Sequence, residues 1–288
     1  MKPVFPSPTK TWHNDVYPAI DPTLPKNSHA GQTVIITGAG SGIGRETAIA
    51  FAAAGTKHLV LIGRSESTLA DTESLLPGNP KCSIFQADIT DEAAMEKVAK
   101  AVCKWDVLIL NAGYISSPSP VANARLDDYW MNYETNVKSI IIAAKAFFPT
   151  ANAKRAVVLG NTAGAIALPT KQVVGLSGYL TSKLAQIKTL EFLAAENPKM
   201  FACSVHPGMI ETDIFLKSGA RPDQLPMDTV QLPAHFMVWL STPNAQFLNG
   251  KFVWANWDVE ELQSQAKEIE SSDKMSVTFQ GWPFANMG

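Results

Sequence analysis

Short, continuous apolar runs alternate with longer amphipathic stretches through most of this sequence, from Thr33 to Trp254. Continuous apolar runs are typical of strands that are buried on both faces, as in a parallel sheet covered by helices. Alternation of such strands with helices indicates an α/β fold. We therefore predict a doubly wound, mostly parallel sheet of about seven strands with helices on both faces.

The same pattern gives the bounds of the elements. The predicted strands are Thr33–Thr37, His58–Ile62, Cys82–Gln86, Val107–Leu110, Ala156–Leu159, Phe201–Val205 and Lys251–Trp254. The predicted helices are one between Gly44 and Gly55, then Glu66–Leu76, Glu92–Val102, Asp127–Phe148 and Tyr179–Ala195. These elements fill residues 31–254, which we predict to be a single domain. Residues 1–30 hold six prolines and little periodicity, so we expect an extended N-terminal arm, with a C-terminal extension at residues 255–288.

Composition excludes several classes of protein. Hydrophobic residues make up 46% of the chain and charged residues 17%, which fits a globular enzyme and argues against disorder. The formal net charge of −2 offers no basic surface for nucleic acid or an anionic membrane. The N-terminus lacks the apolar core of a signal peptide, and Lys145 interrupts the strongest apolar stretch in mid-chain, Ile140–Ala144, so we expect a cytoplasmic protein.

The three cysteines, Cys82, Cys103 and Cys203, are widely spaced. Neither a Cys-x-x-Cys pair nor a Cys/His cluster occurs, so the sequence predicts neither a metal site nor a disulfide framework. We expect free, buried thiols.

A glycine-rich segment, TGAGSGIG, lies directly between a predicted strand and a predicted helix. Main chain without side chains can approach a pyrophosphate closely, and a helix N-terminus adds free N–H groups and partial positive charge. The spacing differs from G-x-G-x-x-G, because Ile43 stands where the last glycine would be. The segment predicts a nucleotide site made by Gly38, Ser41, Gly42, Ile43 and Gly44.

Six motifs in chain order resemble those of short-chain dehydrogenases/reductases. The glycine loop is similar to the family's T-G-x-x-x-G-x-G segment. The other five are Ala87-Asp88-Ile89, Asn111-Ala112-Gly113, Asn136 in Asn-Val-Lys-Ser, Tyr179-Leu-Thr-Ser-Lys183 and Pro207-Gly208-Met-Ile210-Glu-Thr212. The match runs from Thr37 to Thr212 and leaves out both terminal segments, although FVWANWDVEEL weakly resembles fungal members. The resemblance implies a Rossmann-type fold whose motif residues contact a nicotinamide dinucleotide.

The end of the second strand indicates which dinucleotide binds. An acidic residue there would hydrogen-bond the ribose 2′-hydroxyl of NAD(H) and repel a 2′-phosphate. This chain has Gly63 followed by Arg64. A guanidinium forms charge-assisted bonds with phosphate, so the pair favours NADP(H) over NAD(H).

Tyr179 and Lys183 are four residues apart, so they share one face of the predicted helix. A phenol with a pKa near ~10 is a poor base at neutral pH, and a nearby ammonium lowers that pKa by favouring the phenolate. The resemblance implies that Tyr179 exchanges a proton with the substrate oxygen. It also implies that Lys183 tunes Tyr179 and holds the nicotinamide ribose, and that Asn136 supports a water-linked proton path.

One position departs from the family pattern. A serine normally near the end of the fifth strand, in a segment like S-S-x-A-G, bonds the reacting oxygen. This chain has Gly160-Asn161-Thr162-Ala163-Gly164, which places Asn161 in the serine position with Thr162 next to it. An amide or a hydroxyl can donate to a developing oxyanion, so either residue could serve. Alternatively, the site has moved to a non-redox task such as epimerisation.

The resemblance therefore predicts an NADP(H)-dependent enzyme that interconverts a carbonyl and a secondary alcohol. The substrate is expected to be small or medium-sized and hydrophobic, for example polyketide- or terpenoid-like, with Thr170–Gly178 and Asp213–Pro233 as walls. Trp254, Trp257 and Trp282 could line the crevice, but core or interface positions are more common for such residues. A homodimer or homotetramer is typical of the family. The third alternative is an NADP(H)-sensing protein without turnover, against which the retained Tyr179 and Lys183 argue.

Overall fold

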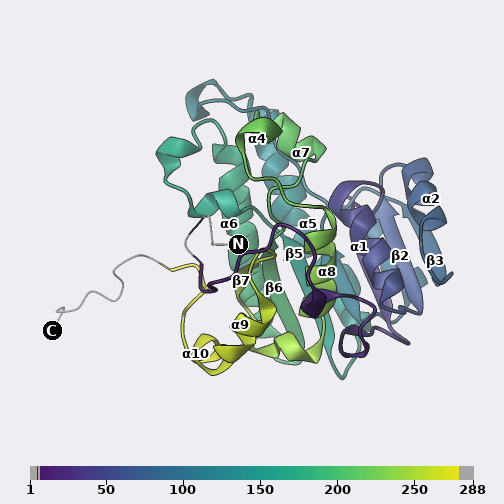
Figure 1. Cartoon of the computed structure of the whole chain (residues 1–288). Helices are drawn as coiled ribbons and strands as arrows, with labels where there is room; N and C mark the ends of the chain where they lie inside the picture. The colour runs from purple at the N-terminus through teal and green to yellow at the C-terminus, as the bar shows by residue number, and fades with distance from the viewer. Residues whose placement is uncertain (1–4, 6, 279–288) are drawn as a thin grey trace.

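The sheet contains all seven predicted strands, every neighbouring pair being parallel, in the order β3–β2–β1–β4–β5–β6–β7 (Figure 1). This computed structural model describes residue 5 and residues 7–278. The strands are β1 (Thr33–Thr37), β2 (His58–Gly63), β3 (Lys81–Gln86), β4 (Val107–Leu110), β5 (Ala156–Asn161), β6 (Met200–His206) and β7 (Phe252–Trp254). The doubly wound fold predicted from the apolar pattern is thus confirmed.

The α-helices in the described part of the chain cover the sheet and extend beyond it. They are α1 (Gly42–Ala53), α2 (Glu66–Ser74), α3 (Glu92–Val102), α4 (Leu126–Tyr133), α5 (Ser139–Phe147), α6 (Ser177–Glu196), α7 (Asp213–Lys217), α8 (Gln231–Leu240), α9 (Val259–Ser264) and α10 (Ala266–Glu270). The prediction of one continuous helix over Asp127–Phe148 was wrong in one respect. A π-helical turn, Glu134–Lys138, separates α4 from α5. Such turns often occur at functional sites, and this one contains Asn136.

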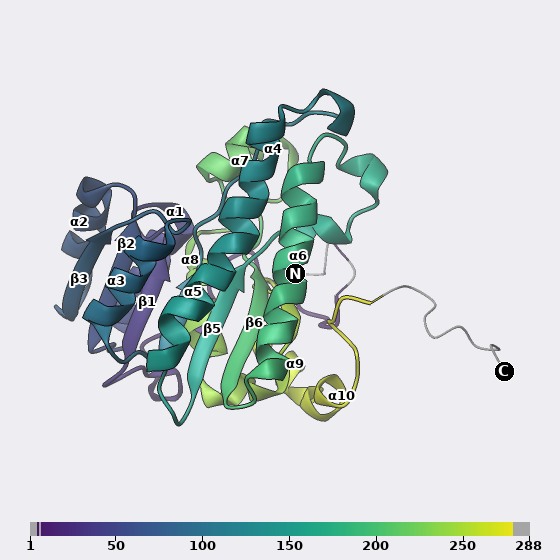
Figure 2. The same cartoon turned by 180° about the vertical axis from the view of Figure 1, so that it is seen from behind.

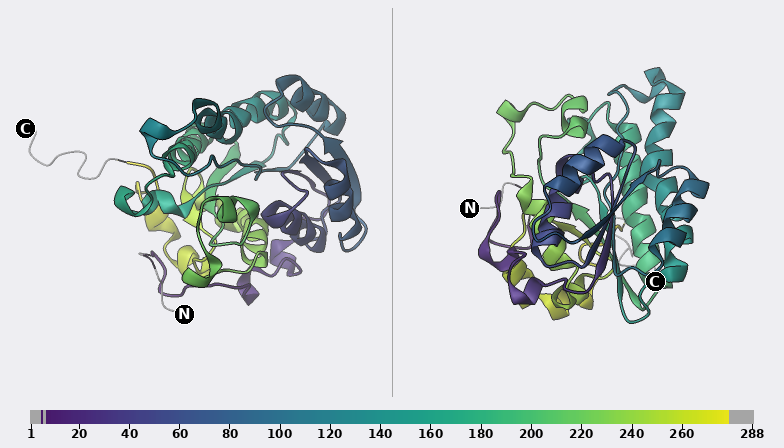
Figure 3. Two further views of the ribbon diagram at one scale, coloured as in Figure 1. Left: turned by 90° about the horizontal axis from the view of Figure 1, so that it is seen from above. Right: turned by 90° about the vertical axis from the view of Figure 1, so that its right-hand side faces the viewer.

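Helices cover both faces of the sheet. Helices α1 and α8 lie on the face toward the viewer in Figure 1, and α3, α5 and α6 lie on the opposite face, seen in Figure 2. Figure 3 shows the sheet between these two layers. Side chains of β1 alternate between two cores: Val34 and Ile36 pack with α1 and α8, whereas Ile35 packs with α3 and α5. Burial on both faces explains why the strand is apolar at successive positions.

The chain reverses its winding direction between β1 and β4, which are neighbours in the sheet although β2 and β3 intervene in the sequence. Ligands of open α/β sheets bind at such a point, beyond the carboxyl ends of the strands. The glycine-rich loop follows β1, and Asn111-Ala112-Gly113 follows β4. The topology therefore brings two of the predicted motifs to the same crevice.

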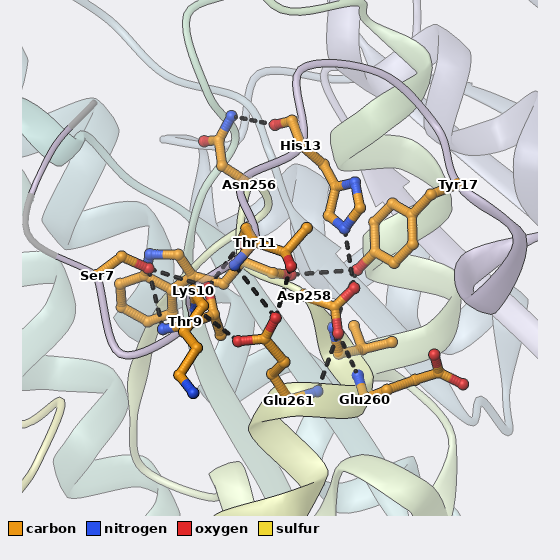
Figure 4. A network of polar contacts seen from close by, with 12 residues as sticks. Ser7, Thr9, Lys10, Thr11, His13, Tyr17, Asn256, Asp258, Glu260 and Glu261 are labelled. Carbon is orange, nitrogen blue, oxygen red and sulfur yellow. Dashed lines mark hydrogen bonds and ion pairs between the residues drawn. The ribbon is translucent and has the colours of Figure 1, made fainter. Parts of the chain in front are cut away.

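The N-terminal segment packs against the segment that follows β7. Trp12 forms an antiparallel bridge with Trp257, and the main-chain N–H of His13 donates to Asn256 O at 2.9 Å. Side chains continue this contact in Figure 4, where Glu261 accepts from the hydroxyl of Thr11 at 2.6 Å. Burial of Trp12 within the main core shows that this part of the arm belongs to the packed structure.

The structure shows the burial of the tryptophans and cysteines that the sequence analysis singled out, as far as they lie in the described residues. Trp254 and Trp257 are buried and stacked in the core, as their more common role predicts; Trp282 lies outside the described residues. All three cysteines are free. The expectation of buried thiols is confirmed for Cys203, whereas Cys82 is half-buried and Cys103 is exposed. Cys103 is the C-cap residue of α3 and has a positive φ of 65°. Over the described range, no helix is both long and apolar enough to cross a membrane.

Candidate active site

The glycine-rich loop has the geometry of a phosphate cradle. Gly38 and Gly42 have φ of +66° and +49°, which disfavour residues with side chains. A Cβ atom at Gly44 would lie 2.2 Å from the main-chain oxygen of Gly38. Ser41 precedes α1 in an extended conformation, and its side chain makes no capping bond to the helix. Ile43 packs against the core, so main chain faces the crevice, and the loop fits a dinucleotide pyrophosphate.

The turn after β4 is bonded to this loop. The side-chain amide of Asn111 donates to the main-chain oxygens of Thr37 at 3.0 Å and Gly38 at 3.2 Å. The main-chain N–H groups of Asn111 and Ala112 donate to Thr37 Oγ1. The Asn-Ala-Gly motif thus helps to fix the path of the chain where it enters the glycine-rich loop.

Arg64 lies at the end of β2, and its side chain is exposed. Its main-chain oxygen accepts a hydrogen bond from Gln86 Nε2 at 2.9 Å, which fixes the backbone there. No hydrogen bond or ion pair of its guanidinium is found in the part of the chain that the structure describes. The cation is therefore available to a ligand, and no acidic side chain stands at Gly63.

Asp88 and Ile89 follow β3. One carboxylate oxygen of Asp88 accepts from the main-chain N–H and the hydroxyl of Thr90, which closes a tight turn. Ile89 packs against the core between the sheet and α3. The structure therefore places this motif beside the other strand ends, with the Asp88 side chain engaged in its own turn.

Asn136 is held rigidly in the π-helical turn. Its Oδ1 accepts from Tyr114 N, and its Nδ2 donates to Tyr114 O and to Ser182 Oγ, each at 2.9 Å. A Cβ atom at Gly113 would lie 3.3 Å from Asn136 Oδ1 and 3.4 Å from Lys183 Nζ. Gly113 therefore permits two predicted site residues, one from the π turn and one from α6, to approach the same patch of backbone.

Tyr179 and Lys183 lie on the first two turns of α6. Lys183 is 3% exposed, and its Nζ lies 5.8 Å from the centre of the Tyr179 ring. Burial raises the pKa of the Tyr179 phenol and lowers the pKa of Lys183 to about 7. Desolvation is the cause of both shifts, because burial disfavours the phenolate as well as the ammonium. The assignment of Lys183 as the cation that tunes Tyr179 stays a prediction.

The residues at the serine position bond within the protein. Asn161 donates from Nδ2 to Asn111 Oδ1 at 2.7 Å, and its own Oδ1 is buried without a hydrogen-bond partner among the described residues. The Thr162 hydroxyl donates to the main-chain oxygen of Lys183 at 3.4 Å. Both predicted oxyanion donors thus already have acceptors. Ser177, two residues before Tyr179, has a buried hydroxyl without a hydrogen-bond partner within residues 5 and 7–278.

The segment after β6 is bonded to Asp228 and reaches the glycine-rich loop. Gly208 has a φ of +94°, and Met209 N donates to Asp228 Oδ2 at 2.7 Å. Thr212 caps α7 by accepting from Phe215 N at 3.3 Å. A Cβ atom at Gly42 would lie 3.4 Å from the Thr212 methyl group, so this segment reaches the glycine-rich loop. Pro207 and Ile210 lie between these contacts, and Ile210 is buried.

Comparison with known proteins agrees with this assembly of motifs. The profile of the family described as short chain dehydrogenase matches residues 32–223. The chain belongs to the short-chain dehydrogenase family. A short chain dehydrogenase, mpl6, of Monascus purpureus is 33% identical over 291 residues, covering 94% of this chain and 97% of that protein. A short chain dehydrogenase/reductase of Claviceps purpurea is 34% identical over 269 residues, covering 90% of this chain and 89% of that protein.

Solved structures share the fold at lower sequence identity. The 3-ketoacyl-(acyl-carrier-protein) reductase from Brucella melitensis, complexed with NADH, superposes with a TM-score of 0.71 at 22% identity, covering 79% of this chain and 97% of that one. A short-chain dehydrogenase/reductase of glucose/ribitol dehydrogenase type from the same organism gives a TM-score of 0.72 at 22% identity, covering 81% and 98%. Other structures of this fold are complexes with NADP and NADPH.

Two residues of this short-chain dehydrogenase escaped the sequence analysis. Gln186 bonds the Lys183 ammonium at 2.9 Å, and Asp228 fixes the turn at Met209. Gln186 had a detectable signal, since it lies three residues after Lys183 on the face of α6 that also carries Ile187 and Leu190. A polar residue on such an apolar face needs a partner. Asp228 lies in an irregular loop and carried no comparable signal.

Proposed function

We propose that this short-chain dehydrogenase is an NADP(H)-dependent oxidoreductase that interconverts a carbonyl and a secondary alcohol. The observation that carries the proposal is the grouping of Tyr179 and Lys183 with Asn136 beside Gly113. These side chains come from α6 and from the π turn, and the Gly113 turn joins them to the glycine-rich loop through Asn111. A phenol beside a dinucleotide cradle can exchange the proton that accompanies hydride transfer to or from a carbonyl group.

Each group has a defined task in the direction of reduction. A bound nicotinamide would be the source of the hydride for the carbonyl carbon. Tyr179 gives its phenolic proton to the carbonyl oxygen, which leaves a phenolate. Burial keeps the phenol protonated beforehand, as a proton donor must be. Lys183 in its charged form stabilises the phenolate by Coulomb attraction. The reverse sequence oxidises an alcohol.

The cofactor is NADP(H) rather than NAD(H) on this proposal. The glycine-rich loop and the N-terminus of α1 would hold the pyrophosphate, and Pro207–Thr212 would border the nicotinamide. The guanidinium of Arg64 is exposed and has no ion pair within the part of the chain that the structure describes, which supports binding of a 2′-phosphate.

A hydrophobic substrate fits the loops at the mouth of the crevice. Val174 in the Thr170–Gly178 segment is 72% exposed, and Leu216 on α7 is 51% exposed. Ser119 N donates to Gly175 O at 2.9 Å, which ties the first of these loops to the segment after β4. The two loops would therefore present apolar surface to a small or medium-sized organic carbonyl compound.

A homodimer or homotetramer is also proposed. The helices α4, α5 and α6 present exposed apolar side chains at Trp130 (55%), Ile141 (52%) and Phe192 (57%). Exposed apolar surface of this kind is characteristic of protein interfaces. Light scattering coupled to size-exclusion chromatography would measure the mass, and a monomer at micromolar concentration would contradict this part of the proposal.

The deciding experiment is NADPH oxidation with a panel of apolar ketones, comparing wild type with Tyr179→Phe. Loss of a general acid is expected to lower kcat by roughly 10²- to 10⁴-fold. Tyr133→Phe is a matched control, because it removes a phenolic hydroxyl that bonds only Thr181, at 2.7 Å, within the described chain. NADPH binding, followed by fluorescence, should survive both changes. Turnover of Tyr179→Phe at the wild-type rate would overturn the assignment, and isomerisation without net oxidation would favour an epimerase.

A further inference from the structure

A closed ring of three hydrogen bonds holds the Lys183 ammonium. Its Nζ donates to the main-chain oxygen of Asn161 and to Gln186 Oε1, each at 2.9 Å. Gln186 Nε2 donates to the same Asn161 oxygen at 3.0 Å. Gln186 is 2% exposed and lies one turn beyond Lys183 on α6. The amide of Gln186 therefore bonds both the ammonium and the ammonium's other acceptor.

Neutral groups surround this cation. The groups around it come from β5 (Asn161 O), the turn after β4 (Gly113) and the π turn (Asn136), and Tyr179 is the titratable neighbour on its own helix. Among the residues that the structure describes, none of the ion pairs includes Lys183. Without a carboxylate, two neutral oxygens replace the water that the ammonium loses on burial.

The space for Gln186 depends on a glycine in β5. A Cβ atom at Gly160 would lie 3.0 Å from Gln186 Nε2 and 2.4 Å from Leu190 Cδ1. Any side chain at Gly160 would therefore displace the amide or the leucine. Gly160 and Gln186 fit each other, and Asn161, next to Gly160, contributes its carbonyl oxygen to the ring.

We propose that Gln186 is a positioning residue for Lys183, holding the ammonium against the end of β5, beside Gly113 and Asn136. The inference rests on the proposed function at one point only, namely that Lys183 stabilises the phenolate of Tyr179. Gln186 touches neither the substrate nor the phenol in this role. It sets where the positive charge lies and how strongly that charge is stabilised.

Two near-isosteric variants have opposite expected effects on Lys183. Gln186→Leu removes one acceptor from a buried ammonium, which favours neutral Lys183 and lowers its pKa further than burial already does. Gln186→Glu places a negative charge at the same contact and moves this pKa upward. If Gln186 had a purely structural role, the two variants would not shift the pKa of Lys183 in opposite directions.

The test is NMR of protein labelled at lysine Nζ and Cε, without cofactor, titrated with pH. Lys183→Met assigns the signal, and Leu190→Met serves as the packing control because Leu190 lies beside the same glycine without polar contacts. We expect the protonation equilibrium of Lys183 to shift at least about tenfold toward the neutral form in Gln186→Leu. In Gln186→Glu it should shift about tenfold the other way, and in Leu190→Met it should stay at the wild-type value.

Thermal unfolding shows whether each variant folds. If Gln186→Leu does not fold, the comparison of the Lys183 titration between Gln186→Glu and wild type is sufficient to test the inference. Unchanged titration in the folded variants, or shifts in the same direction, would overturn the inference. The alkaline limb of NADPH oxidation should move with the NMR titration. If no ketone of the panel oxidises NADPH, the proposed function is wrong. The NMR titration then still decides whether Gln186 positions Lys183.

Discussion

The side-chain amide of Asn161, at the end of β5, donates a hydrogen bond to Asn111 Oδ1 at 2.7 Å. Asn111 in turn donates to the main-chain oxygens at the start of the glycine-rich loop. One chain of hydrogen bonds thus joins the ends of β5, β4 and β1, which are neighbours in the sheet. The residue at the family's serine position is part of the frame that supports the nucleotide crevice.

Removing this amide should affect stability as well as activity. In Asn161→Ala the half-buried Asn111 Oδ1 loses its donor, so we expect the free energy of unfolding to fall by about 1–3 kcal/mol. Thr162→Ala loses only a hydrogen bond of 3.4 Å and should cost less. Urea denaturation measures both values. Wild-type turnover in both variants would exclude an oxyanion role for either residue.

Lys183→Met tests the charge at the site. Burial lowers the pKa of Lys183 to about 7 from 10.5, so between these pH values the unfolded chain binds a proton that the folded protein has released. The stability of wild type therefore rises with pH across this window. The destabilisation that comes from burying the Lys183 charge is fully present below pH 7. The stability of Lys183→Met relative to wild type should be greater at pH 7 than at pH 10, measured by urea denaturation.

The same variant should lose catalytic activity. Without the ammonium, the phenolate left on Tyr179 lacks its charged neighbour, so kcat is expected to fall by about a hundredfold or more. A relative stability that is independent of pH would contradict the lowered pKa, whereas unchanged kcat would contradict the assigned role of Lys183.

Arg64→Ala should change the choice of cofactor. Loss of a charge-assisted contact to the 2′-phosphate is expected to raise the KM for NADPH by roughly ten- to a hundredfold, and the KM for NADH should hardly change. Arg221→Ala is the control, since Arg221 is also exposed and pairs with Asp223. Equal effects of Arg64→Ala on both cofactors would show that the guanidinium does not recognise the phosphate.

His206 makes the strand end beside the site sensitive to acid. Burial lowers its pKa to about 3 from 6.5, and its Nδ1 accepts from Gly164 N at 2.9 Å. Below pH 6.5 the unfolded chain binds a proton that folded His206 excludes, so stability is lost progressively as the pH falls toward 3. His29, with its pKa lowered to about 4, adds to this loss.

The test is the melting temperature of His206→Asn between pH 7 and 4. The melting temperature of the variant should decrease less than that of wild type over this range, because the variant lacks His206. The acid sensitivity that comes from His29 is common to both proteins. A parallel decline of the two proteins would contradict the assignment to His206.

Sequence patterns predicted the strands well and the helix after β4 less well. Val34, Ile35 and Ile36 are all apolar because the two faces of β1 enter different cores, so a continuous run indicates a central strand. The break between α4 and α5 had no such signal. The π-helical turn at this break contains Asn136, whose side chain bonds the main chain of Tyr114 in the loop before α4. Contacts of this kind depend on the packed structure.

The sequence by itself determined the order of strands and helices, the glycine-rich loop and the four-residue spacing of Tyr179 and Lys183. These features are local, because each depends on apolar periodicity or on residues within one or two turns. Only the tertiary structure decided that Lys183 bonds Asn161 and Gln186, and that Asn161 bonds Asn111. Which polar groups meet depends on how parallel strands far apart in the chain align in the sheet, and burial there sets their protonation.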